Sequence, residues 1–436
     1  RPDQPWSGRF TLGGEEVEKN PVTVYTRSPS FLPETIPMLP RSPRTHAFFC
    51  LPLFLSALSV DGFAEALVDV HTQQFTERPI PRFQVDAAWP TIPDELILGQ
   101  VSGLSVDGSD NVWILQRPNS LGFSDTGLAQ NPPIAVCCRP APHVMRFAPD
   151  GTYLDGWGGP AYAPEIDGVN QWPATVHGLY VDDRRSVWIA GNGDGDHVVL
   201  NFTAEGDFLR SLGRRNATGG NFDRETLGGP ADIAYDPQTG EALIADGYIN
   251  KRIIGFGDDG EFTRFWGAYA SSPDEASREG AFDQSQAASN DDGGADPESG
   301  TFGDIVHCVV KGPDDRIYVC DRRNNRLQVF ATTDDGETEF VRDIVIAPST
   351  GGTRTASDVA WSPDGRFMYV ADMMNGQVWI LDAGSYEELG ALGRNGRYPG
   401  QFIWLHSVDV DSKGNVYTSE VGTGRRVQKF VFQGVR

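Results

Sequence analysis

A unit of four short apolar segments occurs six times between residues 100 and 436, and this repeat constrains the fold most. A complete copy contains a strand, an Asp/Gly turn, a second strand, a loop and two further strands, beginning as SGLSVDGSDNVWILQR in the first copy. Four antiparallel strands per copy, at a spacing of about 40–55 residues, are typical of propeller blades. The sequence therefore predicts an all-β fold, a six-bladed β-propeller over residues 100–436.

The sixth copy, which begins HSVDVD, shows only three strands. Arg82–Asp86, in a lead-in segment of residues 67–99, alternates polar and apolar side chains like an isolated strand. We expect this N-terminal strand to complete the sixth blade and close the ring, because closure leaves no long unpaired strand edge.

Residues 38–66 have the order of features of a secretory signal peptide. Two arginines precede the apolar stretch Ala47–Val60, and Ala64 and Ala66 fit the small-x-small pattern before a cleavage position after Ala66. We expect cleavage there, with residues 1–37 as a non-native upstream segment. The alternative is an N-terminal anchor or an ordinary loop. The signal peptide predicts a secreted or periplasmic protein with no stable membrane anchor after cleavage.

The formal charge of −24 argues against a nucleic-acid partner or an anionic membrane surface, since phosphate contacts need a basic face. Four cysteines lie outside the predicted signal peptide. Cys308 and Cys320 fall on the two strands of one predicted hairpin, where they could form a disulfide or remain buried thiols. Cys137 and Cys138 lie in an insertion, where a vicinal disulfide and two bridges elsewhere are both open.

Three of the seven histidines occupy one position of the repeat, the opening of the first strand, in alternate copies. They are His177, His307 and His406, and small residues take the position in the other three copies: Ser102, Ala231 and Ser357. In a closed ring, three imidazoles from alternate blades would converge on the axis, as a tetrahedral metal ion with one open position requires. The alternative is three separate structural histidines, but the small residues favour an open, lined centre.

In an antiparallel hairpin, the end of the second strand lies at the same edge as the start of the first. Arg117 and Tyr248 follow second strands and should therefore share a face with the histidines, as should Arg322, Arg323 and Met373. An arginine can bind a substrate carboxylate and depress the pKa of a nearby tyrosine, which then becomes a plausible general base. Taken singly, either residue could be an ordinary loop residue.

From about Phe83 to Phe432 the chain resembles the NHL-repeat propellers, and among them the peptidyl-α-hydroxyglycine α-amidating lyases. The most specific match is DGY followed by N-x-R-I; VCDRRNNRLQVF and the HSVDVD copy add to it. The resemblance implies catalytic zinc on the three histidines, with Arg117 and Tyr248 as catalytic residues. It also implies a secreted zinc-dependent carbon–nitrogen lyase that cleaves a peptidyl- or N-acyl-α-hydroxyglycine, a peptide or small-molecule substrate, to an amide and glyoxylate.

The same resemblance implies a structural calcium ion held partly by the backbone carbonyls of Leu104 and Leu179. This chain departs from the family beside the third histidine. Ser407 replaces the carboxylate ligand that follows it, and Trp404 replaces a methionine of the pocket wall. Two other functions remain open: a zinc-dependent hydrolase of another small substrate at the same site, and a non-catalytic NHL binding or scaffold propeller.

Overall fold

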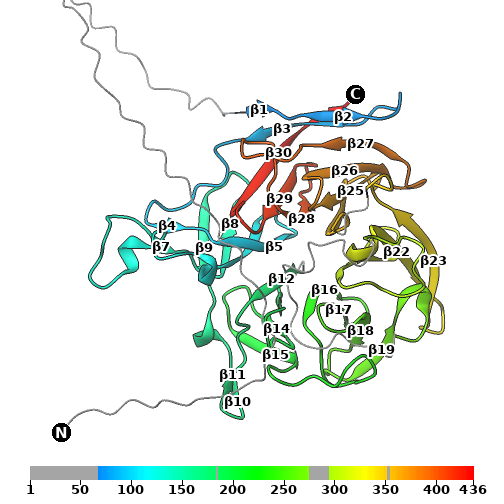
Figure 1. Ribbon diagram of the computed structural model, residues 1–436, viewed down its shortest axis with the longest axis horizontal. Helices are drawn as coiled ribbons and strands as arrows, with labels where there is room; N and C mark the ends of the chain where they lie inside the picture. Colours follow the sequence, from blue (N-terminus) through cyan, green and yellow to red (C-terminus); the bar gives the residue numbers. More distant parts are fainter. Residues whose placement is uncertain (1–66, 183–184, 274–293, 351–353) are drawn as a thin grey trace, which may run out of the picture. The chain divides into compact units, whose positions relative to one another are not determined.

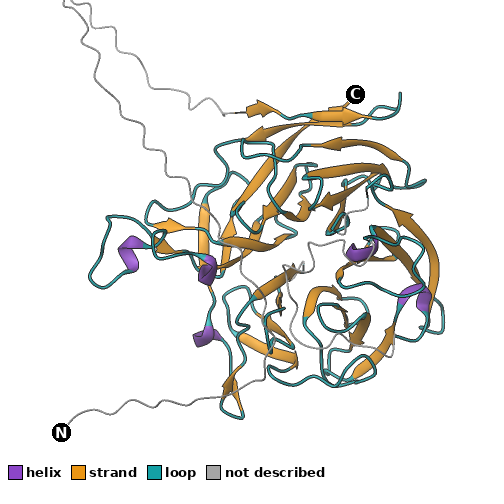
Figure 2. Ribbon diagram, viewed as in Figure 1, coloured by secondary structure: helices purple, strands orange, loops and turns teal. Residues whose placement is uncertain are grey.

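The computed structural model describes residues 67–182, 185–273, 294–350 and 354–436. These residues form the expected six-bladed β-propeller, with strands of successive blades arranged around a centre (Figure 1). Strands dominate, and the helices are short 3₁₀ turns (Figure 2). Within the described ranges, no helix has the length and apolarity needed to cross a membrane. The predicted signal peptide and upstream segment lie outside these ranges, so the domain boundaries stay predictions.

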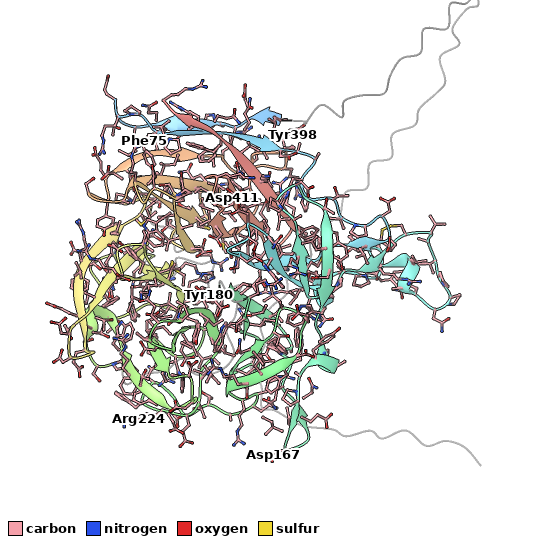
Figure 3. The ribbon with its side chains drawn as sticks, turned by 180° about the vertical axis from the view of Figure 1, so that it is seen from behind. Phe75, Asp167, Tyr180, Arg224, Tyr398 and Asp411 are labelled. Carbon is pink, nitrogen blue, oxygen red and sulfur yellow. A yellow bond between two sulfur atoms is a disulfide. The ribbon has the colours of Figure 1, made fainter. Side chains whose placement is uncertain are left out.

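Each blade is an antiparallel sheet whose first strand is innermost. Blade one consists of β5 (Gln100–Val106), β6 (Val112–Arg117), β8 (Val144–Phe147) and β9 (Tyr153–Trp157). Blade two consists of β12 (Val176–Val181), β13 (Val187–Gly191), β14 (Val198–Phe202) and β15 (Phe208–Gly213). Blade three consists of β16 (Pro230–Asp236), β17 (Glu241–Asp246), β18 (Arg252–Phe256) and β19 (Phe262–Trp266). Seen from behind, Tyr180 of β12 lies near the centre, whereas Phe75 and Asp167 lie at the rim (Figure 3).

The second half of the ring repeats this order. Blade four consists of β20 (Val306–Lys311), β21 (Ile317–Asp321), β22 (Arg326–Thr332) and β23 (Thr338–Val345). Blade five consists of β24 (Asp358–Trp361), β25 (Phe367–Asp372), β26 (Gln377–Asp382) and β27 (Glu388–Leu392). Blade six contains β28 (Leu405–Val410), β29 (Val416–Glu420) and β30 (Arg426–Val435).

The lead-in closes the ring as predicted. Strand β3 (Pro81–Asp86) pairs antiparallel with β30 and alternates buried and half-buried residues. Two three-residue strands of the lead-in were not foreseen: β1 (Leu67–Asp69) pairs with β3, and β2 (Thr72–Gln74) pairs with β27 of blade five. Three residues are too few for a period-2 pattern to stand out, which is why the sequence did not reveal them. The lead-in therefore ties blade five to blade six.

The hydrophobic core consists of six clusters, one between each pair of neighbouring blades. At the closing seam, Phe83 of β3 is buried, and its ring centroid lies 6.0 Å from those of both Tyr369 and Phe432. Both cysteine pairs are disulfides. Cys308–Cys320 joins β20 to β21, and Cys137–Cys138 is vicinal. The core thus runs around the ring and leaves the centre to the inner strands.

Candidate metal centre

The opening of each histidine-bearing strand is irregular. The β-ladder of β12 shifts between Val176 and Leu179, that of β20 between Val306 and Cys308, and that of β28 between Leu405 and Ser407. Each shift leaves the histidine out of regular pairing, as in a β-bulge, which bends the strand and re-aims a side chain. The openings of β5 and β16 show the same shift, so this irregularity belongs to the repeat and is not specific to the histidines.

The three histidines converge on one point. Their ring centroids are 4.7–5.0 Å apart, and each offers a nitrogen atom such that the three atoms lie within 4.8 Å of one another. All three side chains are buried. Nitrogen ligands around a tetrahedral zinc ion stand about 3.4 Å apart, so a small inward movement would complete such a site. The cluster could hold a metal ion.

Backbone carbonyls fix the orientation of the imidazoles. Nδ1 of His177 donates to the carbonyl oxygen of Ala231 (2.7 Å), and Nδ1 of His307 donates to that of Ser357 (2.6 Å). Nδ1 of His406 lies 3.4 Å from the Ser407 hydroxyl, and the Ser102 backbone acts on the pKa of His406 as an acceptor does. Because a carbonyl only accepts, the Nδ1 atoms of His177 and His307 carry the proton and their Nε2 atoms keep a lone pair. Nε2 of His307 has no hydrogen-bond partner among the described residues. Its lone pair is therefore available to bind a metal ion.

Burial also keeps the cluster uncharged. It lowers the pKa of each of the three histidines well below the usual value, and nearby positive charges act in the same direction. For His406 these charges are Arg117 and Arg322. Metal binding requires the neutral imidazole, so the electrostatic surroundings favour the form that binds a metal.

Tyr248 and Arg117 lie on the same face as the histidines, as the hairpin argument predicted. The Tyr248 hydroxyl donates to Nε2 of His177 at 2.7 Å, and its ring packs edge-on against that imidazole. Arg117 donates from Nε to the carbonyl oxygen of Val176 (2.7 Å) and from Nη1 to Gln100 (3.1 Å). Burial lowers the Arg117 pKa to about 10, and Tyr248 acts in the opposite direction.

Two further arginines border the site. Arg322 places its Cζ atom 6.0 Å from the centroid of the Tyr248 ring, and Arg354 places its Cζ atom 5.0 Å from that of Trp404. The sequence indicated the face of Arg322, but Arg354 was missed. Its position in the repeat could have revealed it, because Arg354 lies three residues before the blade opening Ser357. In the other copies this position holds no arginine but Gly99, Ala174, Gly228, Asp304 and Ile403.

The DGY-N-x-R-I motif holds Tyr248 in place. Arg252 and Asn250 both donate to Asp246, the last residue of β17, across the turn that carries Tyr248. In blade four, Asn324 and Arg326 donate in the same way to Asp321, across the turn that carries Arg322. The residues that make the motif recognisable are thus structural clamps.

The predicted calcium ligands line a channel next to the histidines. Leu104, Leu179 and Ser407 border a cavity of about 330 Å³, and the Ser407 hydroxyl lies 3.4 Å from the Ser102 carbonyl oxygen. The cavity also contains the carboxyls of Asp232 and Asp358, whose pKa values are raised, chiefly by burial. Calcium binding by the two leucine carbonyls stays a prediction.

Comparison with known proteins agrees with this architecture. The NHL repeat family model matches residues 306–330. NHL repeat-containing protein 3 of Mus musculus is 25% identical over 395 residues, which cover 88% of this chain and 94% of that protein. Peptidylglycine alpha-amidating monooxygenase of Rattus norvegicus is 25% identical over 345 residues, 77% of this chain and 30% of that protein.

A third relative is peptidyl-alpha-hydroxyglycine alpha-amidating lyase 1 of Drosophila melanogaster. It is 24% identical over 374 residues, which cover 80% of this chain and 59% of that protein. The chain therefore contains an NHL repeat and is a distant relative of both NHL repeat-containing protein 3 and the amidating lyases.

Proposed function

We propose that this protein is a secreted zinc-dependent lyase that cleaves a peptidyl- or N-acyl-α-hydroxyglycine to an amide and glyoxylate. The observation that carries the proposal is the buried, neutral cluster of His177, His307 and His406 with the Tyr248 hydroxyl 2.7 Å from one ligand atom. The Nε2 atoms would hold zinc, which supplies Lewis acidity toward the hydroxyl or carboxylate oxygens of the substrate.

The reaction moves one proton and breaks one bond. Tyr248 would act as the phenolate: it would take the proton of the substrate hydroxyl while the C–O bond becomes the aldehyde of glyoxylate and the C–N bond breaks. The amide nitrogen leaves with its electron pair and gains a proton, so no oxidant, reductant or water is consumed. Arg117, half-buried beside the cluster, binds and orients the substrate carboxylate through its guanidinium.

The two alternatives make different demands on these residues. A scaffold propeller needs no converging donors, so the carbonyl bonds that orient His177 and His307 count against it. A hydrolase could use the same metal ligands but would break the acyl C–N bond. The nearby tyrosine and arginine, together with the distant relationship to the amidating lyases, favour the lyase.

The decisive assay identifies both products of α-hydroxyhippurate. We expect benzamide and glyoxylate, near-stoichiometric zinc in the purified protein, and loss of activity in a chelator that zinc reverses. Benzoate in place of benzamide would indicate the hydrolase, and a zinc-free, inactive wild type would end both enzyme proposals.

Tyr248→Phe tests the role of the hydroxyl. We expect it to slow glyoxylate release by about 10²–10⁴-fold while zinc stays bound, because a positioned general base contributes that much. The matched control is Tyr398→Phe, which changes an exposed tyrosine and should leave the rate unchanged. A fully active Tyr248→Phe variant would refute the assignment.

A further inference from the structure

Gln100 faces Arg117 across the first hairpin of blade one. The two residues are opposite partners in the ladder between β5 and β6, and Nη1 of Arg117 donates to Oε1 of Gln100 at 3.1 Å. A guanidinium group only donates hydrogen bonds, so the Gln100 amide must turn its oxygen atom toward Arg117. Gln100 therefore contacts the residue that the proposed function assigns to the substrate carboxylate, although it does not belong to the histidine cluster.

The acceptors that hold Arg117 are all neutral. Nε of Arg117 donates to the backbone carbonyl oxygen of Val176 at 2.7 Å, and Nη2 has a longer contact, 3.5 Å, with Oδ1 of Asn192. Among the residues that the structure describes, no carboxylate forms an ion pair with Arg117. The contacts thus fix the guanidinium without neutralising it, and a charge withdrawn from water in this way favours an anion beside it.

One hydroxyl group locks the backbone on both sides of the Gln100–Arg117 contact. Oγ of Ser120 accepts the N–H of Gln100 at 2.8 Å and donates to the carbonyl oxygen of Arg117 at 2.7 Å. A Cβ atom at Gly99 would lie only 2.1 Å from that same carbonyl oxygen, so this close approach requires glycine. The two side chains are therefore mounted on a rigid backbone, which favours a fixed orientation of the guanidinium.

The neutral amide leaves part of the guanidinium fork for another acceptor. A guanidinium has five N–H groups, and Arg117 uses three of them in the contacts described above. Within the described part of the chain, one N–H group on each η nitrogen has no acceptor, and such a pair of groups can bind a carboxylate bidentately. The substitution Gln100→Glu would keep the shape of the side chain but pair a carboxylate with Arg117, which would compete with the substrate.

We propose that Gln100 is a positioning residue. It orients the Arg117 guanidinium through a neutral oxygen atom and so keeps the positive charge of Arg117 available to the α-carboxylate of the substrate. This role rests on the proposed lyase function and adds a determinant of substrate class to it. The protein selects α-hydroxyglycine derivatives with a free carboxylate over the corresponding primary amides, and Gln100 determines that selection.

Two compounds without the reactive hydroxyl, N-benzoylglycine and its primary amide, test the selection. By titration calorimetry on the zinc-loaded protein, we expect the acid to bind about 10–100-fold more tightly, because it adds hydrogen bonds between charged groups. Gln100→Glu should remove this preference. Gln100→Leu, which removes the acceptor without adding a charge, should reduce it by about 3–10-fold. The matched control Gln238→Glu changes an exposed glutamine and should keep the wild-type preference.

Three results would overturn the proposal. The first is equal affinity of the wild type for the acid and the amide. The second is a wild-type preference retained in both Gln100 variants with zinc bound. The third is an equal loss of affinity for both compounds in Gln100→Glu, because a merely structural role would weaken binding without regard to the carboxylate.

Turnover separates this proposal from the function on which it rests. For N-benzoyl-α-hydroxyglycine and its primary amide, kcat/KM for benzamide release should favour the acid, and Gln100→Glu should abolish the preference mainly through KM. Benzamide release from both compounds at equal kcat/KM in the wild type would refute the role of Gln100 and leave the lyase intact. A binding preference that Gln100→Glu abolishes, with no benzamide from either compound, would support the role of Gln100 and refute the lyase.

Discussion

At the residue scale, the small residues at the alternate blade openings contribute through their backbone carbonyl groups. Ala231 and Ser357 place carbonyl oxygens where the imidazoles of His177 and His307 need acceptors. The repeat register exposed these positions as small, which suggested an open centre. Their role in setting the imidazole tautomer could not be predicted, because it depends on the distance between neighbouring blades.

Asp232 supplies a pH-dependent prediction. Burial raises its pKa to about 7, whereas in the unfolded chain it would titrate near 4. The folded state therefore holds a proton that the unfolded state has lost, and stability falls as pH rises from about 4 through 7. In chelator, Asp232→Asn should match the wild type near pH 4 and exceed its free energy of unfolding by about 2–4 kcal/mol at pH 8.

Urea unfolding at several pH values measures this difference. Asp94→Asn, which changes an exposed carboxyl, is the control and should show no comparable trend. If the wild type were the more stable protein at pH 8 in chelator, the carboxyl would be stabilised in its charged form and the prediction would be wrong. Added calcium should reduce the difference in unfolding free energy between Asp232→Asn and the wild type only if a calcium ion binds in the channel.

At the scale of the elements, a buried ion pair recurs at the turn between the second and third strands. Asp246–Arg252 and Asp321–Arg326 are fully buried at both partners, and Glu420–Arg426 occupies the same place in blade six. Each pair joins two strands near the face that bears the histidines. The pairs therefore connect the stability of a blade to the position of its site residue.

Arg252→Leu should cost about 3–5 kcal/mol of unfolding free energy, because it leaves Asp246 buried without its counter-charge. Adding Asp246→Asn should recover part of that loss. The control Arg214→Leu removes an exposed pair with Asp167 and should cost less than about 1 kcal/mol. Equal losses for Arg252→Leu and Arg214→Leu in urea titrations would contradict the assigned role.

The sequence predicted the strands better than it predicted the contacts between residues of neighbouring blades. Period-2 strands and Asp/Gly turns indicated the six blades, and hairpin geometry placed Arg117 and Tyr248 with the histidines. The bulges at the histidines leave no mark in the residue pattern. Arg354 comes from a loop rather than a strand, and its contact with Trp404 joins blades five and six. Such contacts depend on blade packing, which no local pattern encodes.

At the scale of the whole molecule, the ring depends on a strand from the other end of the chain. Phe83 should be its most sensitive position, since it is 4% exposed and packs on Tyr369 and Phe432. Phe83→Ala should lower the free energy of unfolding by about 3–5 kcal/mol through lost burial and a cavity.

Urea unfolding of Phe83→Ala is compared with Gln84→Ala, the half-buried neighbour on the same strand. We expect the Gln84 variant to lose less than about 1 kcal/mol. Similar losses at both positions would mean that β3 contributes mainly through backbone pairing. An unchanged Phe83→Ala variant would mean that the seam is not a point of weakness.

The bonds that orient the imidazoles run from one blade to the next. His177 and Ala231 connect blades two and three, and His307 and Ser357 connect blades four and five. His406 faces Ser102 across the seam between the last blade and the first. The triad is thus complete only when every blade is in place and the seam is sealed. Binding of a metal ion at the three histidines would then require a closed ring, so it would distinguish the closed propeller from a chain whose last strand is still unpaired.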